Sequence, residues 1–295
     1  MNDVVRTEGL TKHFGEVCAV EDLDLVIERG EVFGYLGPNG AGKSTTIRLL
    51  LDFLRPTRGR TVVLGGSGGD PEVRRRIGYL PGDLRLDPTY RAADLIELFG
   101  SLRGGVDRAW VSELLERFEL NPDRPIGELS TGNRRKVGLV QAFMGRPELL
   151  LLDEPTSGLD PLLQQVFNEL VRQVCAEGAT VLLSSHVLPE VEVLAHRVGI
   201  VRSGRLVAVA GIDELRRDAR QRIDLHLAGV ADTSPFRSLP EVVEASAEAG
   251  VVRLVVEGSV DRVIKAAAGL EVQRIVTHDA DLEVVFLRYY QDGDR

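Results

Sequence analysis

The 295-residue sequence has few cysteines and no apolar run long enough to cross a membrane. Its longest uninterrupted apolar segments, such as Leu149–Leu152 and Val181–Leu183, have the length of strands, whereas a membrane span needs about 18 residues. The opening residues, MNDVVRTEGL, lack a basic segment followed by an apolar core, so we expect no signal peptide. Any action at a membrane is therefore expected to need a separate membrane protein.

The low cysteine count and the excess of acidic over basic residues each disfavour some classes of protein. Cys18 and Cys175 lie far apart without the spacing of metal ligands, which indicates reduced and buried thiols. The net charge of -9 disfavours a nucleic-acid partner, because phosphate binding usually needs a basic face. The basic runs Arg74–Arg76 and Arg134–Lys136 are local exceptions, which we interpret as solvated faces. Together these features predict a cytoplasmic protein with no nucleic-acid partner.

Alternating strand and helix patterns predict an α/β fold. Val17–Glu28 alternates apolar and acidic residues as a half-buried strand does, and Glu31–Leu36 is a short apolar strand before a glycine-rich turn. Further strands are expected at Arg60–Leu64, Ile77–Leu80, Leu149–Asp153 and Ala179–Ser184, and helices at Thr46–Phe53 and Leu162–Ala176. Strand–helix–strand alternation implies a mainly parallel sheet covered by helices, here preceded by an antiparallel β subdomain.

The pattern changes twice along the chain. From about Asp83 to Arg146 it is helical, as in Ala92–Arg103 and Trp110–Phe118, which predicts a helical insertion over residues 83–146. A charged stretch at Asp218–Arg222 separates a first domain, residues 1–217, from a small α+β accessory domain, residues 220–295. The elements expected in the second domain are Ile223–Leu227, Val251–Glu257, Val260–Ala268, Val272–Thr277 and an amphipathic helix at Leu282–Tyr290.

A phosphate-binding loop follows the Glu31–Leu36 strand. The segment fits G-x-x-x-x-G-K-[ST] and consists of Gly37, Pro38, Asn39, Gly40, Ala41, Gly42, Lys43 and Ser44, with Thr45 next. Glycines let several backbone N–H groups converge on phosphate oxygens, and the helix N-terminus adds its positive end. Lys43 is expected to reach the β- and γ-phosphates, and the Ser44 hydroxyl to ligate Mg²⁺. The loop alone does not separate ATPases, GTPases and kinases.

Two carboxylates follow the strand of four leucines. Asp153 and Glu154 are expected to emerge at the carboxyl end of a parallel strand, where ligands bind in open α/β sheets. Asp153 suits binding of Mg²⁺ through water, and Glu154 suits polarising the attacking water.

The segment Leu129–Asn133 is a second phosphate-binding element, because its serine and glycine begin a helix. The chain therefore has two such elements and one carboxylate pair. This imbalance predicts a site that a second subunit completes.

The motifs GPNGAGKST, LSTGN, LLLLDEPTSGLD and SSH, in this order and spacing, resemble the nucleotide-binding domain of an ABC transporter over about residues 3–216. The resemblance implies a signature motif that contacts the opposite subunit's γ-phosphate through Ser130 and Gly132, with Thr131 and Asn133 beside them. It also implies a D-loop that communicates across the dimer, formed by Ser157, Gly158, Leu159 and Asp160. His186 matches the switch histidine that contacts the γ-phosphate, and the alternative is a capping or core histidine. Phe14 matches the aromatic that stacks on adenine, and the alternative is core packing.

The sequence departs from the family pattern at three positions. Thr131 and Asn133 replace the usual glycine and glutamine of the signature. Gly82 stands where the family usually has a glutamine that touches Mg²⁺ or the attacking water. We hypothesise that Asp83 or backbone groups take over the link to the helical insertion.

The flanking segments STGNRRKVGLVQAF, TYRAADLIELFGSLRG and EVVFLRYY resemble single-domain ATPases of bacterial drug exporters, including the daunorubicin-resistance type. This implies ATP and Mg²⁺ as cofactors, a second ATPase subunit (identical or different), and separate membrane permease subunits at the cytoplasmic face of the membrane. The alternatives are an importer ATPase, a soluble non-transport ATPase of the same superfamily, and a catalytically inactive regulatory subunit. Residues 220–295 are expected to serve dimer contact or regulation, and the cargo is not encoded in this chain.

Overall fold

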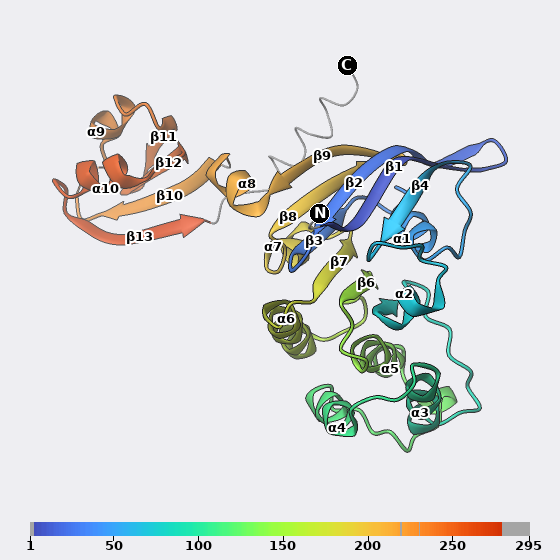
Figure 1. Cartoon of the computed structure of the whole chain (residues 1–295). Coiled ribbons are helices and arrows are strands. Elements are labelled where there is room, and N and C mark those ends of the chain that lie inside the picture. Colours follow the sequence, from blue (N-terminus) through green and yellow to red (C-terminus); the bar gives the residue numbers. More distant parts are fainter. Residues whose placement is uncertain (1–2, 219, 230, 279–295) are drawn as a thin grey trace. The chain divides into compact units, whose positions relative to one another are not determined.

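The computed structural model describes residues 3–218, 220–229 and 231–278 (Figure 1). The chain divides into two compact units, Met1–Val209 and Ala210–Arg295. The helix expected at Leu282–Tyr290, with the acidic positions Asp279, Asp281 and Glu283 around its start, lies outside the described residues.

A six-stranded sheet forms the centre of the first unit. Its order is β5 (Ile77–Leu80), β6 (Leu149–Asp153), β7 (Thr180–Ser185), β3 (Val32–Leu36), β8 (Arg197–Arg202) and β9 (Arg205–Gly211). The strands from β5 to β8 pair in parallel. Every residue of β3, β6 and β7 is buried, as expected for parallel strands covered on both faces.

A three-stranded antiparallel sheet packs against the helix that follows the phosphate loop. Its order is β2 (Val17–Glu28), β1 (Asp3–Phe14) and β4 (Arg58–Val63). One hydrophobic core joins this sheet to helix α1 (Lys43–Leu50) and to the large sheet, through residues such as Leu10, Ile47 and Leu151. The core therefore fixes α1 between the two sheets, at the end of β3.

Helices fill the long connection between β5 and β6. They are α3 (Ala92–Leu102), α4 (Arg108–Arg117), the 3₁₀ helix η1 (Ile126–Glu128) and α5 (Thr131–Phe143), and they form the lower part of the first unit in Figure 1. The indole N–H of Trp110 on α4 donates to the carbonyl oxygen of Phe143 on α5 at 3.0 Å. The remaining helices are α2 (Pro71–Arg75), α6 (Pro161–Ala176) and α7 (Leu188–Glu192). Helix α5 packs against β5, while α6 and α7 contact β7.

The second unit has a four-stranded antiparallel sheet and two helices packed on it. Helix α8 (Ile212–Asp218) precedes strands ordered β11 (Val242–Glu248), β12 (Val251–Glu257), β10 (Arg220–Leu227) and β13 (Val272–His278). Phe236 of α9 (Ser234–Arg237) and Val263 of α10 (Asp261–Ala267) share a separate core with the sheet. The predicted fold class is confirmed: an α/β core with an antiparallel β subdomain and a helical insertion, followed by a small α+β unit.

Three expectations need correction. Helix α1 begins at Lys43, three residues before the predicted start at Thr46, because the loop ends at Gly42 in the left-handed region (φ 100°). The basic run 134–136 is not a solvated face, because Arg135 is 5% exposed and Lys136 is 8% exposed. Cys18 and Cys175 are free thiols, but both are only half-buried.

Candidate functional site

The parallel register brings three chain segments to one edge of the large sheet. Leu36 at the end of β3 is opposite Ser185 of β7, and Asp153 at the end of β6 is opposite Ser184. The phosphate loop follows β3, His186 follows β7, and the carboxylate pair consists of the last residue of β6 and the residue after it. Because the strands run in the same direction, all three segments emerge side by side.

The phosphate loop needs its glycines. A Cβ atom at Gly37 would lie 2.4 Å from the carbonyl oxygen of Val201, and one at Gly42 would lie 2.3 Å from that of Ala19. The loop encloses a cavity of about 190 Å³, small enough to suit the phosphate end of a nucleotide rather than a whole ligand. Its lining is Ala19, Pro38, Asn39, Gly40, Gly42, Lys43, Ser44, Thr45 and Glu154.

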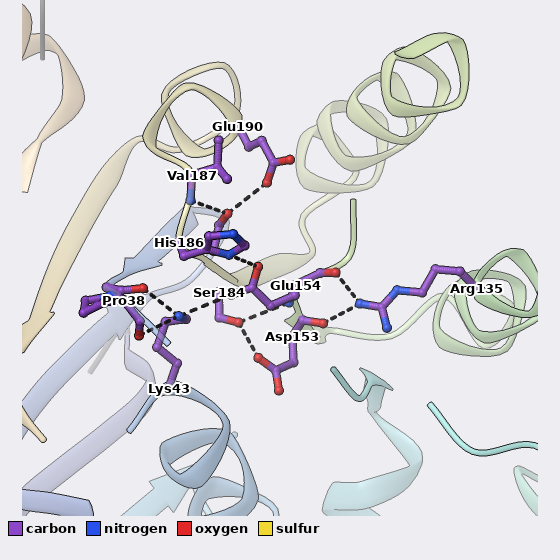
Figure 2. Close-up of polar contacts among 11 residues, drawn as sticks. Pro38, Lys43, Arg135, Asp153, Glu154, Ser184, His186, Val187 and Glu190 are labelled. Carbon is purple, nitrogen blue, oxygen red and sulfur yellow. Dashed lines mark hydrogen bonds and ion pairs between the residues drawn. The ribbon is translucent and has the colours of Figure 1, made fainter. Parts of the chain in front are cut away.

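Lys43 is held across the mouth of this loop. Its side chain is 5% exposed, and Nζ donates to the carbonyl oxygens of Gly37 at 2.6 Å and Pro38 at 3.2 Å. Nζ also lies 3.2 Å from Oε1 of Glu154. Figure 2 shows Lys43 directed toward Glu154 from the side of the loop. A buried ammonium at this position can stabilise phosphate oxygens as they replace the carbonyls.

Asp153 is a buried carboxylate with one firm partner. It is 2% exposed, and Oδ1 accepts a hydrogen bond from the Ser184 hydroxyl at 2.5 Å. Burial of Tyr79 is the main cause of the raised pKa of its hydroxyl, and the negative charge of Asp153 raises that pKa further. The Asp153 carboxylate and the Ser44 hydroxyl, which lines the phosphate cavity, are hard oxygen ligands of the kind that Mg²⁺ prefers, so these residues fit such an ion.

Glu154 lies between Lys43 and His186. Its Oε2 is 2.8 Å from Nδ1 of His186, whose side chain is 47% exposed. Its Oε1 is buried, and its partner among the described residues is the Lys43 ammonium of the ion pair at 3.2 Å, without a well-aligned hydrogen bond. The backbone is in the left-handed region (φ 49°), where Glu154 N–H donates to the Ser184 carbonyl at 3.1 Å. This arrangement can take a proton from a water molecule that binds near Oε1.

The signature and D-loop residues pack on each other. Ser130 caps α5 by accepting a hydrogen bond from the Asn133 N–H at 3.2 Å. A Cβ atom at Gly132 would lie 2.8 Å from the carbonyl oxygen of Gly158. Asp160 caps α6 by accepting from the Leu163 N–H at 3.0 Å. Within the described residues that line the phosphate cavity, none belongs to the signature.

Phe14 ends β1 at the hairpin with β2. Its side chain is 48% exposed, with Nζ of Lys12 at 5.1 Å from the ring centre. Ala19 of the same hairpin lines the phosphate cavity. The stacking of Phe14 on adenine stays a prediction. The exposed ring is accessible to such a partner.

The structure gives a physical reason for glycine at position 82. A Cβ atom there would lie 2.9 Å from Oδ2 of Asp153, so a side chain at this position would require the carboxylate or the loop to shift. The Asp83 carboxylate points elsewhere, because it pairs with Arg85 at 2.8 Å and is 63% exposed. No contact therefore supports the hypothesis that the Asp83 side chain links the site to the helical insertion. The backbone carbonyls of Pro81 and Gly82 do make such a link, because they accept hydrogen bonds from Arg135.

Two residues of the site were missed in the sequence. Ser184, which binds Asp153 and Glu154, had a weak signal as a polar residue ending an apolar strand. Arg135 donates to the backbone carbonyls of Pro81 and Asp153, and its only signal in the sequence was its place in a basic run.

Comparison with known proteins identifies similar chains. A sequence model of the ABC transporter family matches residues 20–157. The daunorubicin resistance ATP-binding protein DrrA3 of Streptomyces coeruleorubidus is 36% identical over 99% of this chain and 97% of its own length. The bacitracin transport ATP-binding protein BcrA of Bacillus licheniformis is 32% identical over 77% of this chain and 76% of its own. A Nod factor export ATP-binding protein I of Paraburkholderia xenovorans is 34% identical over 96% of both chains.

Solved structures agree with this grouping. An ATP-binding subunit of an ABC transporter superposes with a TM-score of 0.67 at 31% identity, covering 72% of this chain and 92% of that one. A bacterial ABC transporter cassette solved as a dimer has a TM-score of 0.63 over 70% of this chain and 98% of its own length. At 23% identity, the second likeness concerns the fold alone.

Proposed function

The chain belongs to the ATP-binding subunits of ABC transporters, and on this premise we propose that it drives the export of a small molecule through separate membrane subunits. ATP hydrolysis is the activity of this family, and the chain is an ATPase. The observation that carries the proposal is the Glu154 carboxylate, set between Lys43 and His186 beside the phosphate cavity. The export direction is supported by relatives named for daunorubicin resistance and for Nod factor export.

The proposed chemistry follows from the resting contacts. Lys43 exchanges the Gly37 and Pro38 carbonyls for the β- and γ-phosphates of ATP. Glu154 then loses its ion pair with Lys43 and accepts a proton from the attacking water, while His186 keeps the carboxylate in place. The Ser44 hydroxyl and, through water, the Asp153 carboxylate would hold Mg²⁺, which would neutralise charge at the phosphates when bound.

We propose that two ATPase subunits share their sites. Ser130 and Gly132 lie at the start of α5 and do not line this chain's own described cavity, which suits contact with the partner's ATP. The amino end of α5, capped by Ser130, has backbone N–H groups that favour an anion. ATP binding would close the pair, and hydrolysis with product release would reopen it.

The proposed location is the cytoplasmic face of the membrane, bound to permease subunits. Among the described residues, no helix has the length and apolar character that a membrane crossing requires. For residues 220–295 we propose a role in dimer contact or regulation, supported by their own core and by the full-length match to DrrA3.

Purification with the membrane protein encoded beside this chain tests the proposal. The complex is placed in inside-out vesicles, and candidate drugs and lipid-like compounds are screened for stimulation of ATP hydrolysis. We expect a stimulating compound to accumulate inside the vesicles when ATP is added outside. ATP-dependent release of a preloaded compound from the same vesicles would identify an importer, and absence of a membrane partner would favour the soluble alternative.

A further inference from the structure

Arg135 connects helix α5 to both loops of the hydrolytic site. Its Nη2 donates to the carbonyl oxygen of Asp153 at 2.6 Å and also to that of Glu154. Its Nη1 donates to the carbonyl oxygens of Pro81 at 2.8 Å and Gly82 at 3.1 Å. Figure 2 shows this side chain reaching Asp153 and Glu154 from the side opposite Lys43.

The burial of Arg135 makes these contacts important for the local backbone. The residue is 5% exposed, and burial lowers the pKa of its guanidinium while the charges of Asp153 and Glu154 raise it. A buried cation needs such acceptors, because an unpaired charge is costly in the interior. A planar guanidinium can serve two loops at once, whereas a lysine presents a single point of charge.

The carbonyl oxygens that Arg135 holds belong to residues in constrained positions. Glu154 has a left-handed backbone (φ 49°), which a glutamate adopts only when the surroundings enforce it. Gly82 has no side chain with which to join its loop to the site, so the backbone link through Arg135 is the contact that the structure provides. A rotation of the peptide at Glu154 would move its carboxylate away from His186.

We propose that Arg135 is a positioning residue for ATP hydrolysis, which ties the backbone of Gly82 and Glu154 to helix α5 of the same chain and so aims the Glu154 carboxylate. This inference rests on the proposed shared-site ATPase. The guanidinium acts within its own chain, whereas Ser130 and Gly132 on the same helix act on the partner's ATP. The two roles of α5 can therefore be separated by experiment.

The first measurement compares Arg135→Met and Arg135→Lys with a matched control, Arg103→Met, in the full-length chain. Arg103 is also desolvated, and it donates to the carbonyl oxygens of Arg75 at 3.1 Å and Ile77 at 3.0 Å, at the start of β5 rather than its end. We expect both Arg135 variants to lose about 10- to 100-fold in kcat, with KM for ATP within about twofold of the unchanged protein. We expect Arg103→Met to lower the melting temperature but to keep kcat within about twofold.

The second measurement uses mixed dimers purified through two different tags, in which one chain carries Glu154→Gln and cannot hydrolyse its own ATP. Arg135→Met is placed either in the chain that keeps Glu154 or in the chain that carries Glu154→Gln. We expect the loss of about 10- to 100-fold only in the first arrangement, and activity within about twofold of the mixed-dimer control in the second. Damage to the signature helix would instead appear in the second arrangement, because that chain supplies the signature to the active site.

Equal losses in both arrangements, no loss in either, or a loss in the Arg103 control as large as in Arg135→Met would each overturn the inference. Failure of the proposed shared-site ATPase is distinguishable, because the unsubstituted chain would then hydrolyse no ATP. Hydrolysis by the unsubstituted chain with unaffected Arg135 variants would leave the ATPase standing and remove Arg135 from it.

Discussion

Glu154 combines a carboxylate that contacts Lys43 and His186 with a backbone held by Ser184 and Arg135. In the proposed mechanism the side chain is the proton acceptor, and the backbone contacts determine where that acceptor points. At the residue scale, hydrolysis and ATP binding should therefore be separable by a substitution that keeps the shape of residue 154.

Glu154→Gln is the substitution that makes this separation. The amide keeps the size of the side chain and can still bind His186, but it cannot take a proton from water. We expect ATP binding to persist and kcat to fall by at least about 100-fold, with a closed dimer accumulating in the presence of ATP. Turnover and size-exclusion chromatography with ATP measure both effects.

The matched control is Glu177→Gln, because Glu177 is an ion-paired surface carboxylate at 3.1 Å from Arg146 and does not line the phosphate cavity. It should leave turnover unchanged. Normal hydrolysis by Glu154→Gln would show that another group is the general base.

At the scale of elements, the loop after β5 is fitted to the end of β6. The sheet order places these two strands side by side, and the loop backbone then lies against the Asp153 carboxylate at Gly82. Restoring the glutamine usual in the family should therefore harm the site rather than improve it.

We expect Gly82→Gln to lower kcat by about 10-fold or more, because its Cβ would lie 2.9 Å from Oδ2 of Asp153 and the loop would have to move. Steady-state ATPase assays measure the change. Gly229→Ala is the control, since a Cβ atom there meets nothing within 4 Å. A rise in activity with Gly82→Gln would contradict the fit described here.

The start of β6 is held by a second contact between elements. The Glu148 carboxylate binds Arg76, which precedes β5, and also Arg29, which follows β2. The hydrogen bond from Arg76, followed by contacts with Arg29, lowers the pKa of Glu148 from 4.5 to about 2. A carboxylate whose pKa is lower in the folded state stabilises the fold fully at pH values above its ordinary pKa. This contribution is lost as the pH falls toward the pKa of the folded state.

Glu148→Gln should therefore lower the free energy of unfolding at pH 7 by about 1 kcal/mol or less, since the pair is partly screened by solvent. The difference should shrink as the pH falls from 4.5 toward 2. Urea unfolding at several pH values measures it. Glu72→Gln, which removes a more exposed ion pair with Arg75, should show little effect at any pH, and a difference for Glu148→Gln that is constant with pH would contradict the assignment.

At the scale of the whole molecule, the two units have separate hydrophobic cores. All residues that line the phosphate cavity belong to the first unit, and the second contributes none among its described residues. ATP binding is thus expected to depend on the first unit alone, whereas the second unit is expected to add to dimer assembly.

Deletion of residues 220–295 should leave the affinity for ATP within about twofold, because the remaining unit keeps its core and its loop. If the proposed role of the second unit is right, the same deletion should weaken ATP-dependent dimer formation or its regulation by the membrane partner. Titration with a fluorescent ATP analogue and light scattering measure the two properties. Unchanged assembly and unchanged coupled ATPase activity would contradict the proposed role.

The sequence alone determined the chemistry of this protein, because each motif is local. The glycines and Lys43 of the phosphate loop need fixed spacing, and Asp153 and Glu154 needed only an apolar strand before them. Their convergence at one sheet edge followed from the parallel pattern of the strands. The α/β fold was predicted for the same reason, although four strands, β1, β8, β9 and β11, were not predicted. In β1 and β11 the apolar residues alternate poorly.

Only the tertiary structure decided how these motifs are held. Arg135 lies 18 residues from Asp153 and 54 from Pro81 along the chain, and nothing in its basic surroundings indicates a buried side chain between two loops. The same holds for Gly82, whose lack of a side chain looked like a defect until β5 and β6 were placed side by side. Such contacts depend on strand order and on the packing of α5, and periodicity along the sequence carries neither.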